Sequence, residues 1–215
     1  MSEPTAQPSE LSEALDRFRD ELLFAKYCLD TYKIIGLNAS DLNVAKTFYG
    51  HLQRMSHLHI AMSLAKIYER ETSRRLCSIA GICRLVADRE VRNKTAIDAL
   101  ARKYTVEPTS DWQGDLTKIR KQQGTRLRRP IAMVRKLRNT RLAHLAAGPI
   151  TNVAPSVAAF EALLEFPIDL YSALRDGFED ISTHKILQDN RQVNSLTKIL
   201  NLSGVEDVKR QFSDI

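Results

Sequence analysis

The chain has 215 residues, enough for one domain with a sizeable core or at most two small ones. It contains only eight glycines, seven prolines and one tryptophan. Because no stretch shows the alternating pattern of a strand either, the composition argues against a sandwich or barrel. The net charge is +6. No apolar run is long enough to cross a membrane, and residues 1–8 lack the apolar core of a secretory signal, so we expect a cytoplasmic protein. The composition and the lack of strand patterns lead us to expect an all-α fold.

The first helix is predicted from about residue 9 to residue 35, after a flexible tail over residues 1–8. Its apolar residues recur at spacings of three and four, and Gly36 stands where a helix-ending glycine belongs. Ser40 or Asp41 is predicted to cap a second helix that reaches about Glu71. The buried face expected on that helix consists of five apolar residues and one histidine: Phe48, Leu52, Met55, His59, Met62 and Ile67.

A third helix is predicted over residues 72–104, with a break near Asp88, and residues 105–111 form a loop. A fourth helical stretch begins near Asp111; Gly124 and Pro130 are expected to interrupt it before it ends near Gly148. Ser156 can start a fifth helix. The sequence therefore predicts a bundle of about five main helices over residues 9–183, with short helices in a C-terminal extension, residues 184–215, packed on the same domain.

Neither a metal nor another cofactor is expected. The three cysteines, Cys28, Cys77 and Cys83, are odd in number and show no CxxC spacing, which indicates reduced, buried small side chains. The histidines of "HLQRMSHLH" have no acidic partner at useful spacing, and the HxH pair on a helix points its imidazoles apart.

Basic residues are concentrated in one part of the chain. Between Leu116 and Phe160 there are ten lysines and arginines and no acidic residue, which leaves 22 basic against 26 acidic residues elsewhere. A local basic stripe is typical of surfaces that bind phosphate-bearing partners. The alternative is a solvated helix face paired with acids from other parts of the chain.

The helix after Pro130 carries charge on the face that should be buried. A rotation of about 100° per residue places Arg138, Arg141 and His144 on the same arc as its apolar side chains. Burying a guanidinium without partners is costly, so these groups must be paired, hydrated or in use. Two copies of the helix across a two-fold axis could pool two arginines and two histidines in one cleft. The alternative is that the arginines extend to solvent and the histidine interacts with the helix end.

The stretch "RNTRLAH", residues 138–144, resembles the signature of the HEPN superfamily, in the form typical of its abortive-infection members. The stretch "HLHIAMSLAKIYERETSRRLCSIAGICRL", residues 57–85, is similar to the paired helices of that group. The resemblance covers roughly residues 10–180 and implies a small helical bundle that dimerises. It also implies a metal-independent ribonuclease of toxin–antitoxin or phage-defence systems, with Arg138 and His144 as the catalytic pair and Asn139 as a supporting residue. Unlike some members, the chain has no tyrosine shortly after His144.

The sequence thus leads to one main hypothesis and two alternatives. The main hypothesis is a homodimeric endoribonuclease that leaves a 2′,3′-cyclic phosphate, with RNA as substrate and an antitoxin or regulatory protein as a possible further partner. The residues expected to bind RNA are Arg126, Arg128, Arg129, Arg135, Lys136 and Arg141. The alternatives are a catalytically inactive module that binds RNA or protein, and a structural dimer whose Arg/His pair only orders the interface.

Overall fold

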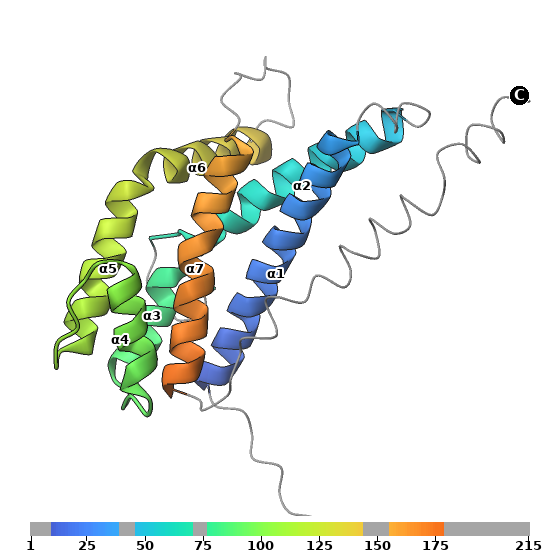
Figure 1. The fold of residues 1–215 in the computed structure, drawn as a ribbon. Coiled ribbons are helices and arrows are strands. Elements are labelled where there is room, and N and C mark those ends of the chain that lie inside the picture. The colour runs from blue at the N-terminus through green and yellow to red at the C-terminus, as the bar shows by residue number, and fades with distance from the viewer. Residues whose placement is uncertain (1–9, 39–45, 71–76, 144–154, 179–215) are drawn as a thin grey trace, which may run out of the picture.

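The computed structural model describes residues 10–38, 46–70, 77–143 and 155–178. These residues form seven helices and no strand (Figure 1). In chain order the helices are α1 (Glu10–Leu37), α2 (Lys46–Ile67), α3 (Ile79–Ala87), α4 (Lys94–Lys103), α5 (Trp112–Arg126), α6 (Arg128–Ala143) and α7 (Val157–Phe178). The all-α bundle predicted from the sequence is therefore confirmed, whereas the predicted C-terminal helices lie outside the described residues.

The core lies where α1, α2 and α7 meet, and α7 also packs against α4 (Figure 1). Helix α1 contributes the six positions that the spacing predicts, and all are buried: Leu11, Leu15, Phe18, Leu22, Ala25 and Leu29. Phe160 and Tyr171 of α7 are fully buried beside them in one continuous apolar cluster that runs along the described chain. The three-and-four spacing of α1 thus identified its buried face.

The predicted buried face of α2 is wrong for its N-terminal half, whereas Ile67, predicted on the same face, is fully buried. Phe48, Leu52 and Met55 keep 64%, 36% and 51% of their surface exposed, whereas Ile60 and Leu64 are fully buried. All the buried residues of α2 lie from Ser56 onward. Figure 1 shows the reason: among the described helices, the N-terminal half of α2 extends beyond α7 and lies beside the end of α1. Burial on α2 therefore depends on which neighbour reaches it and not on its own periodicity.

Three predicted helix boundaries also differ from the structure. Gly36 does not end α1, which continues to Leu37. The stretch from Asp111 breaks at Leu127, between α5 and α6, so Gly124 lies inside α5 and Pro130 inside the first turn of α6. Proline is compatible with that turn because its missing N–H would have had no partner within the helix. The break expected near Asp88 is present, since α3 ends at Ala87.

Local capping fixes both ends of the connection from α4 to α5. Asp111 accepts a hydrogen bond from the N–H of Gly114 and caps α5. Helix α4 ends with Thr105 at φ 56°, where the N–H of Thr105 bonds the Arg102 carbonyl and the N–H of Val106 bonds the Ala101 carbonyl. This is the Schellman arrangement, which turns the chain sharply after a helix. The sequence correctly predicted residues 105–111 as a loop.

Candidate nucleic-acid interface

Helix α6 is held against the bundle by a narrow apolar stripe. Ile131 is 8% exposed, Val134 is fully buried, and Leu137 packs partly buried against the core. These residues are three apart, so they share one side of the helix, which contacts α2 and α7. Arg135 and Arg138 follow Ile131 and Val134 at the i+4 position, and both are only partly exposed. The sequence prediction of charge on the packed side of this helix is therefore confirmed for Arg138.

The arginine of the predicted signature is held by an acidic partner from α2. Nη1 of Arg138 lies 2.8 Å from Oε2 of Glu69, just beyond the end of α2. Its Nε donates to Oδ1 of Asn139 at 3.0 Å. The Arg138 and Glu69 side chains are 27% and 31% exposed, so the pair is largely shielded by protein. The carboxylate of Glu69 and the amide oxygen of Asn139 thus fix the direction of this guanidinium. The side chains of Arg138 and Asn139, both predicted site residues, are in direct contact.

Glu69 stays ionised over a wide pH range. The hydrogen bond from Arg138 holds the pKa of Glu69 below its usual value, a second hydrogen bond from the Arg70 backbone acts in the same direction, and burial opposes both. The nearby charges of Arg138 and Arg135 favour the carboxylate as well. The ion pair to Arg138 is therefore intact at neutral pH.

Arg135 binds the end of α2 directly. Its guanidinium donates to the backbone carbonyl of Tyr68, the residue that follows the last turn of α2. A cation at the C-terminal end of a helix is also favoured by the helix dipole. Burial lowers the pKa of Arg135, although arginine remains a cation at physiological pH. Arg135 and Arg138 together join α6 to the Tyr68–Glu69 segment.

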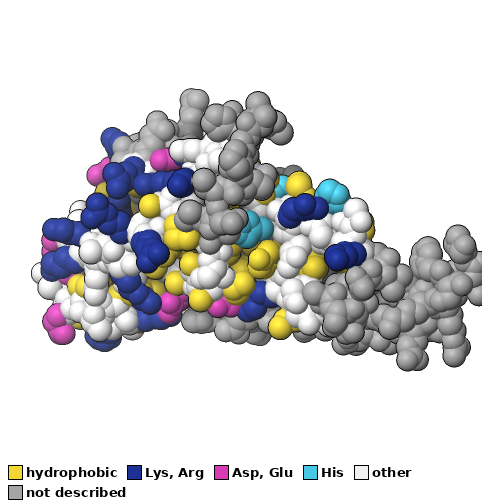
Figure 2. Space-filling model, turned by 90° about the horizontal axis from the view of Figure 1, so that it is seen from above, with side chains coloured by type: hydrophobic (Ala, Val, Ile, Leu, Met, Phe, Trp, Pro, Cys, Tyr) yellow, Lys and Arg dark blue, Asp and Glu magenta, His cyan; other side chains and the backbone are white. Residues whose placement is uncertain are grey.

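The other half of the predicted catalytic pair is His144. His144 lies outside the described residues, as does the side chain of Arg141. The remaining residues predicted to bind RNA, Arg126, Arg128, Arg129 and Lys136, are exposed. Figure 2 shows lysine and arginine side chains gathered over the α5 and α6 side of the molecule. Arg126, Arg128, Arg129 and Lys136 are therefore exposed cations of α5 and α6, and we call them the basic surface.

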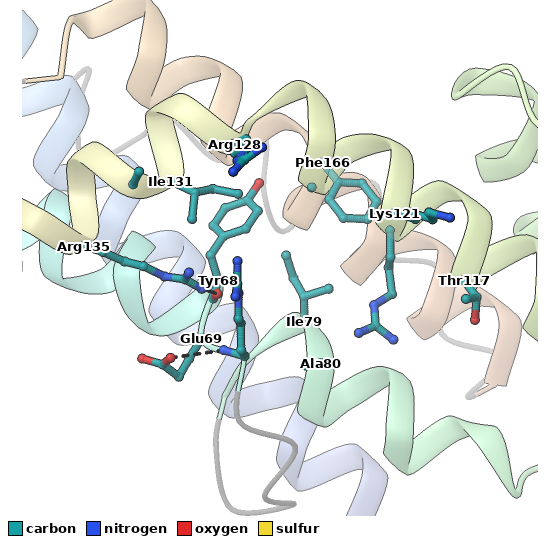
Figure 3. A pocket seen from close by; sticks show the side chains of 14 residues that line it. Tyr68, Glu69, Ile79, Ala80, Thr117, Lys121, Arg128, Ile131, Arg135 and Phe166 are labelled. Atoms are coloured by element: carbon teal, nitrogen blue, oxygen red, sulfur yellow. Dashed lines mark hydrogen bonds between the residues drawn. The ribbon is translucent and has the colours of Figure 1, made fainter.

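A cavity of about 500 Å³ opens beside this segment, between the end of α2, the start of α3, and α5, α6 and α7 (Figure 3). Arg128 and Arg135 line it, together with three cations that were not among the predicted site residues: Arg70, Arg120 and Lys121. Arg120 and Lys121 belong to residues 116–160, which contain no acidic residue, and this local charge pattern could have identified them as candidate binding residues. Arg70 carries no such signal, because only the packing of α2 against α6 brings it there.

The described part of the chain offers neither a membrane span nor a metal centre. None of its helices combines the length and apolar character that a bilayer requires. No group of three or more histidine, cysteine, aspartate or glutamate side chains lies close enough together in it to hold an ion. Instead, His57 contacts the rings of Tyr32 and Phe160, and His59 contacts that of Phe24. Among the cysteines, Cys83 is buried as expected, while Cys28 and Cys77 are partly buried.

Comparison with known proteins agrees with the helical architecture. The model of the HEPN family AbiU2 matches residues 8–196, which is most of the chain. No curated protein and no solved structure gave a match. The family match spans all seven helices of the described residues and includes residues 138–144. The chain belongs to the AbiU2 family of HEPN proteins.

Proposed function

We propose that this protein is a metal-independent endoribonuclease of a toxin or phage-defence system that acts as a homodimer. Each subunit would contribute Arg138 and His144 to one cleft, with Asn139 in support. The observation that carries the proposal is the environment of Arg138. A guanidinium on the packed side of α6, directed by Glu69 and Asn139, is fixed on the helix that also carries the exposed cations Arg128, Arg129 and Lys136. Membership of the HEPN family supports the same assignment.

The chemistry needs only these side chains and the RNA itself. One histidine removes the proton of a 2′-hydroxyl, whose oxygen attacks the adjacent phosphorus. The bond from phosphorus to the 5′-oxygen breaks, and the histidine of the second subunit protonates that oxygen. The products are a 2′,3′-cyclic phosphate and a 5′-hydroxyl. Arg138 would stabilise the extra negative charge on the phosphorus oxygens in the transition state.

The exposed cations would hold the rest of the strand. Arg126 of α5 and Arg128, Arg129 and Lys136 of α6 are all exposed. Neutralising successive phosphates releases bound counterions and supplies most of the sequence-independent affinity for RNA. RNA, a second copy of this chain and a regulatory antitoxin are therefore the partners we propose, and a cytoplasmic location stays a prediction.

A second function is favoured by one specific observation. Arg138 already forms an ion pair with Glu69 within a single chain, so this guanidinium has a structural role that does not require a substrate. The alternative is a catalytically inactive module that binds RNA or a protein through the same basic surface. A further alternative is a purely structural dimer, in which Arg138 and His144 would serve only to order the interface.

The decisive experiment is cleavage of end-labelled single-stranded and structured RNA in EDTA. The wild type would be compared with His144→Ala and Arg138→Ala, and with Arg102→Ala as the matched control. Arg102 is an exposed arginine of α4 outside the basic stretch. Circular dichroism and light scattering would first establish equal folding and equal oligomeric state. We expect EDTA-resistant products with cyclic-phosphate ends from the wild type and the control, and loss of about 100-fold or more in both site variants.

Each other outcome selects a different function. A well-folded dimer that binds RNA but never cleaves it would favour the inactive binding module. Cleavage that survives His144→Ala would mean that the catalytic residues are misassigned. Loss of stability in Arg138→Ala, with no RNA binding by the wild type, would favour the purely structural role.

A further inference from the structure

Apolar side chains are exposed at one end of the bundle, on the two N-terminal helices. The large apolar side chains that are exposed in the described ranges all belong to α1 and α2: Phe24, Leu37, Phe48, Leu52 and Met55. Soluble proteins rarely leave apolar side chains grouped in water, so such a group indicates a surface that another element or molecule covers.

The exposed residues of α2 form one stripe along the helix. Phe48, Leu52, Met55 and His59 follow each other at spacings of four, three and four, which is the spacing of the residues that join two paired helices. A rotation of about 100° per residue puts them on an arc about 60° wide, roughly 120° away from the buried side of α2. The ring of His59 lies 5.5 Å from that of Phe24 on α1. We call Phe48, Leu52, Met55 and His59 the outer stripe.

The chain contains a further segment with matching spacing. Residues 205–215, "VEDVKRQFSDI", lie outside the described residues and beyond the part that the family model matches. Their apolar residues are three, four and three positions apart: Val205, Val208, Phe212 and Ile215. The preceding "SGVE", residues 203–206, has the capping-box pattern that predicts a helix start. A helix over residues 205–215 would be about 15 Å long, and the outer stripe is about 17 Å long.

The end of α7 is close enough for residues 205–215 to reach the outer stripe. Arg175, in the last turn of α7, lies 3.4 Å from Asp16 near the start of α1. From Asp16 to Leu37, at the far end of α1, the distance along the helix is about 32 Å. The 26 residues from 179 to 204 would span about 39 Å even if all of them were helical. The connection therefore covers the whole length of α1, beside whose end the start of α2 lies (Figure 1).

Charge and tethering favour this segment over a second copy of the chain as the occupant of the stripe. Helix α2 contains no acidic residue, and its Lys46 and Arg54 are exposed. Two copies of α2 face to face would therefore bring like charges together, whereas residues 203–215 carry three acidic and two basic side chains. A tethered segment also has an effective concentration of roughly millimolar, well above that of a second molecule in dilute solution.

We propose that residues 205–215 form a helix that docks on the outer stripe, with their apolar side chains against Leu52 and Met55. Docking removes from water the apolar surface that α2 exposes and ties the last part of the sequence to the α1–α2 end of the bundle. The stripe lies at the opposite end of α2 from Glu69, the partner of Arg138. The inference therefore goes beyond the proposed ribonuclease site and does not depend on it.

The test is the reactivity of a cysteine placed in the outer stripe of the full-length protein. Met55→Cys would be treated with an aromatic disulfide reagent, and its rate would be corrected for the native cysteines by measurement of the wild type. We expect this thiol to react at least about tenfold more slowly than that of Arg54→Cys, because a docked helix must open first. Arg54 is the matched control position, since it is exposed on the same helix and lies outside the stripe.

A second substitution identifies what covers the stripe. Adding Phe212→Asp to Met55→Cys should raise the reaction rate at least about tenfold, to that of an exposed thiol, because a carboxylate is costly to bury in an apolar contact. Ser213→Asp is its control: it adds the same charge one residue away, outside the apolar spacing, and should leave the rate unchanged. Circular dichroism would first establish equal helix content in all variants.

Three results would overturn the proposal. One is a Met55→Cys thiol that reacts equally fast with and without Phe212→Asp. Another is an equal increase in rate with Phe212→Asp and Ser213→Asp, which would indicate a general charge effect. The third is protection that grows with protein concentration and persists with Phe212→Asp, which would identify a second copy as the occupant. Because the assay contains no RNA, its result can be interpreted even if the ribonuclease proposal fails.

Discussion

The ion pair between Arg138 and Glu69 allows the sharpest test of how α6 is held on the bundle. The perturbation is a double-mutant cycle of Glu69→Gln and Arg138→Gln, with unfolding free energies measured in urea. The two charged atoms are 2.8 Å apart, and the side chains are 27% and 31% exposed. Fully exposed pairs couple by about 0.2–1 kcal/mol, and a hydrogen bond between charged groups in a shielded site contributes about 1.5–3 kcal/mol. We therefore expect a coupling energy of about 1 kcal/mol at pH 7.

The coupling should depend on pH in one direction. The folded-state pKa of Glu69 is lowered, mainly by the hydrogen bond from Arg138, relative to an ordinary value of 4.5. A carboxyl group with a lowered pKa binds its proton more readily in the unfolded chain. Its contribution to stability is thus complete above pH 4.5 and is lost as the pH falls through the folded-state pKa. The coupling energy should be constant between pH 6 and 8 and should decrease in more acidic solution.

A matched pair on α1 serves as the control. Arg17 and Glu13 lie 3.6 Å apart with side chains 66% and 54% exposed. Their coupling should not exceed about 0.5 kcal/mol, as for other exposed helix pairs at this spacing. Zero coupling between Arg138 and Glu69 at pH 7, or a coupling that persists unchanged in acid, would refute the reasoning.

Two further predictions concern the basic surface and the end of α4. Arg129→Gln should make the binding of single-stranded RNA less dependent on salt, because one phosphate contact is lost. The slope of log K against log salt, measured by fluorescence anisotropy, should decrease in magnitude by about 0.7. An unchanged slope would exclude Arg129 from the interface. Thr105→Gly should raise the unfolding free energy by about 0.5–1 kcal/mol in urea titrations, because Thr105 has φ 56°, a conformation that costs a β-branched residue more than glycine. A lower unfolding free energy for Thr105→Gly would show that the hydrogen bond from its hydroxyl to the Tyr104 carbonyl outweighs the backbone strain.

Parts of the fold and of the site followed from local sequence patterns. The spacing of Leu11 through Leu29 predicted both a helix and its buried face, because a long amphipathic helix has one apolar side wherever it packs. Asp111 and Ser156 predicted helix starts, since a side-chain oxygen near a free N–H acts locally. Charge on the packed side of α6 could also be predicted from rotation alone, and Arg138 lies there.

Other features depended on contacts that no local pattern contains. The apolar side chains Phe48, Leu52 and Met55 are exposed because α7 does not reach the N-terminal half of α2. Glu69 was not singled out in the sequence, although it is the ion-pair partner of Arg138, because the two residues are 69 positions apart in the chain. Arg70 joins Arg120 and Lys121 at one cavity only through the packing of α2 and α3 against α5 and α6. The sequence alone determined the helical character of the chain, the acid-free basic stretch and the HEPN signature, since these are properties of neighbouring residues. Only the tertiary structure decided which charges face each other, because ion pairs and cavities depend on distances between segments that the chain brings together from far apart.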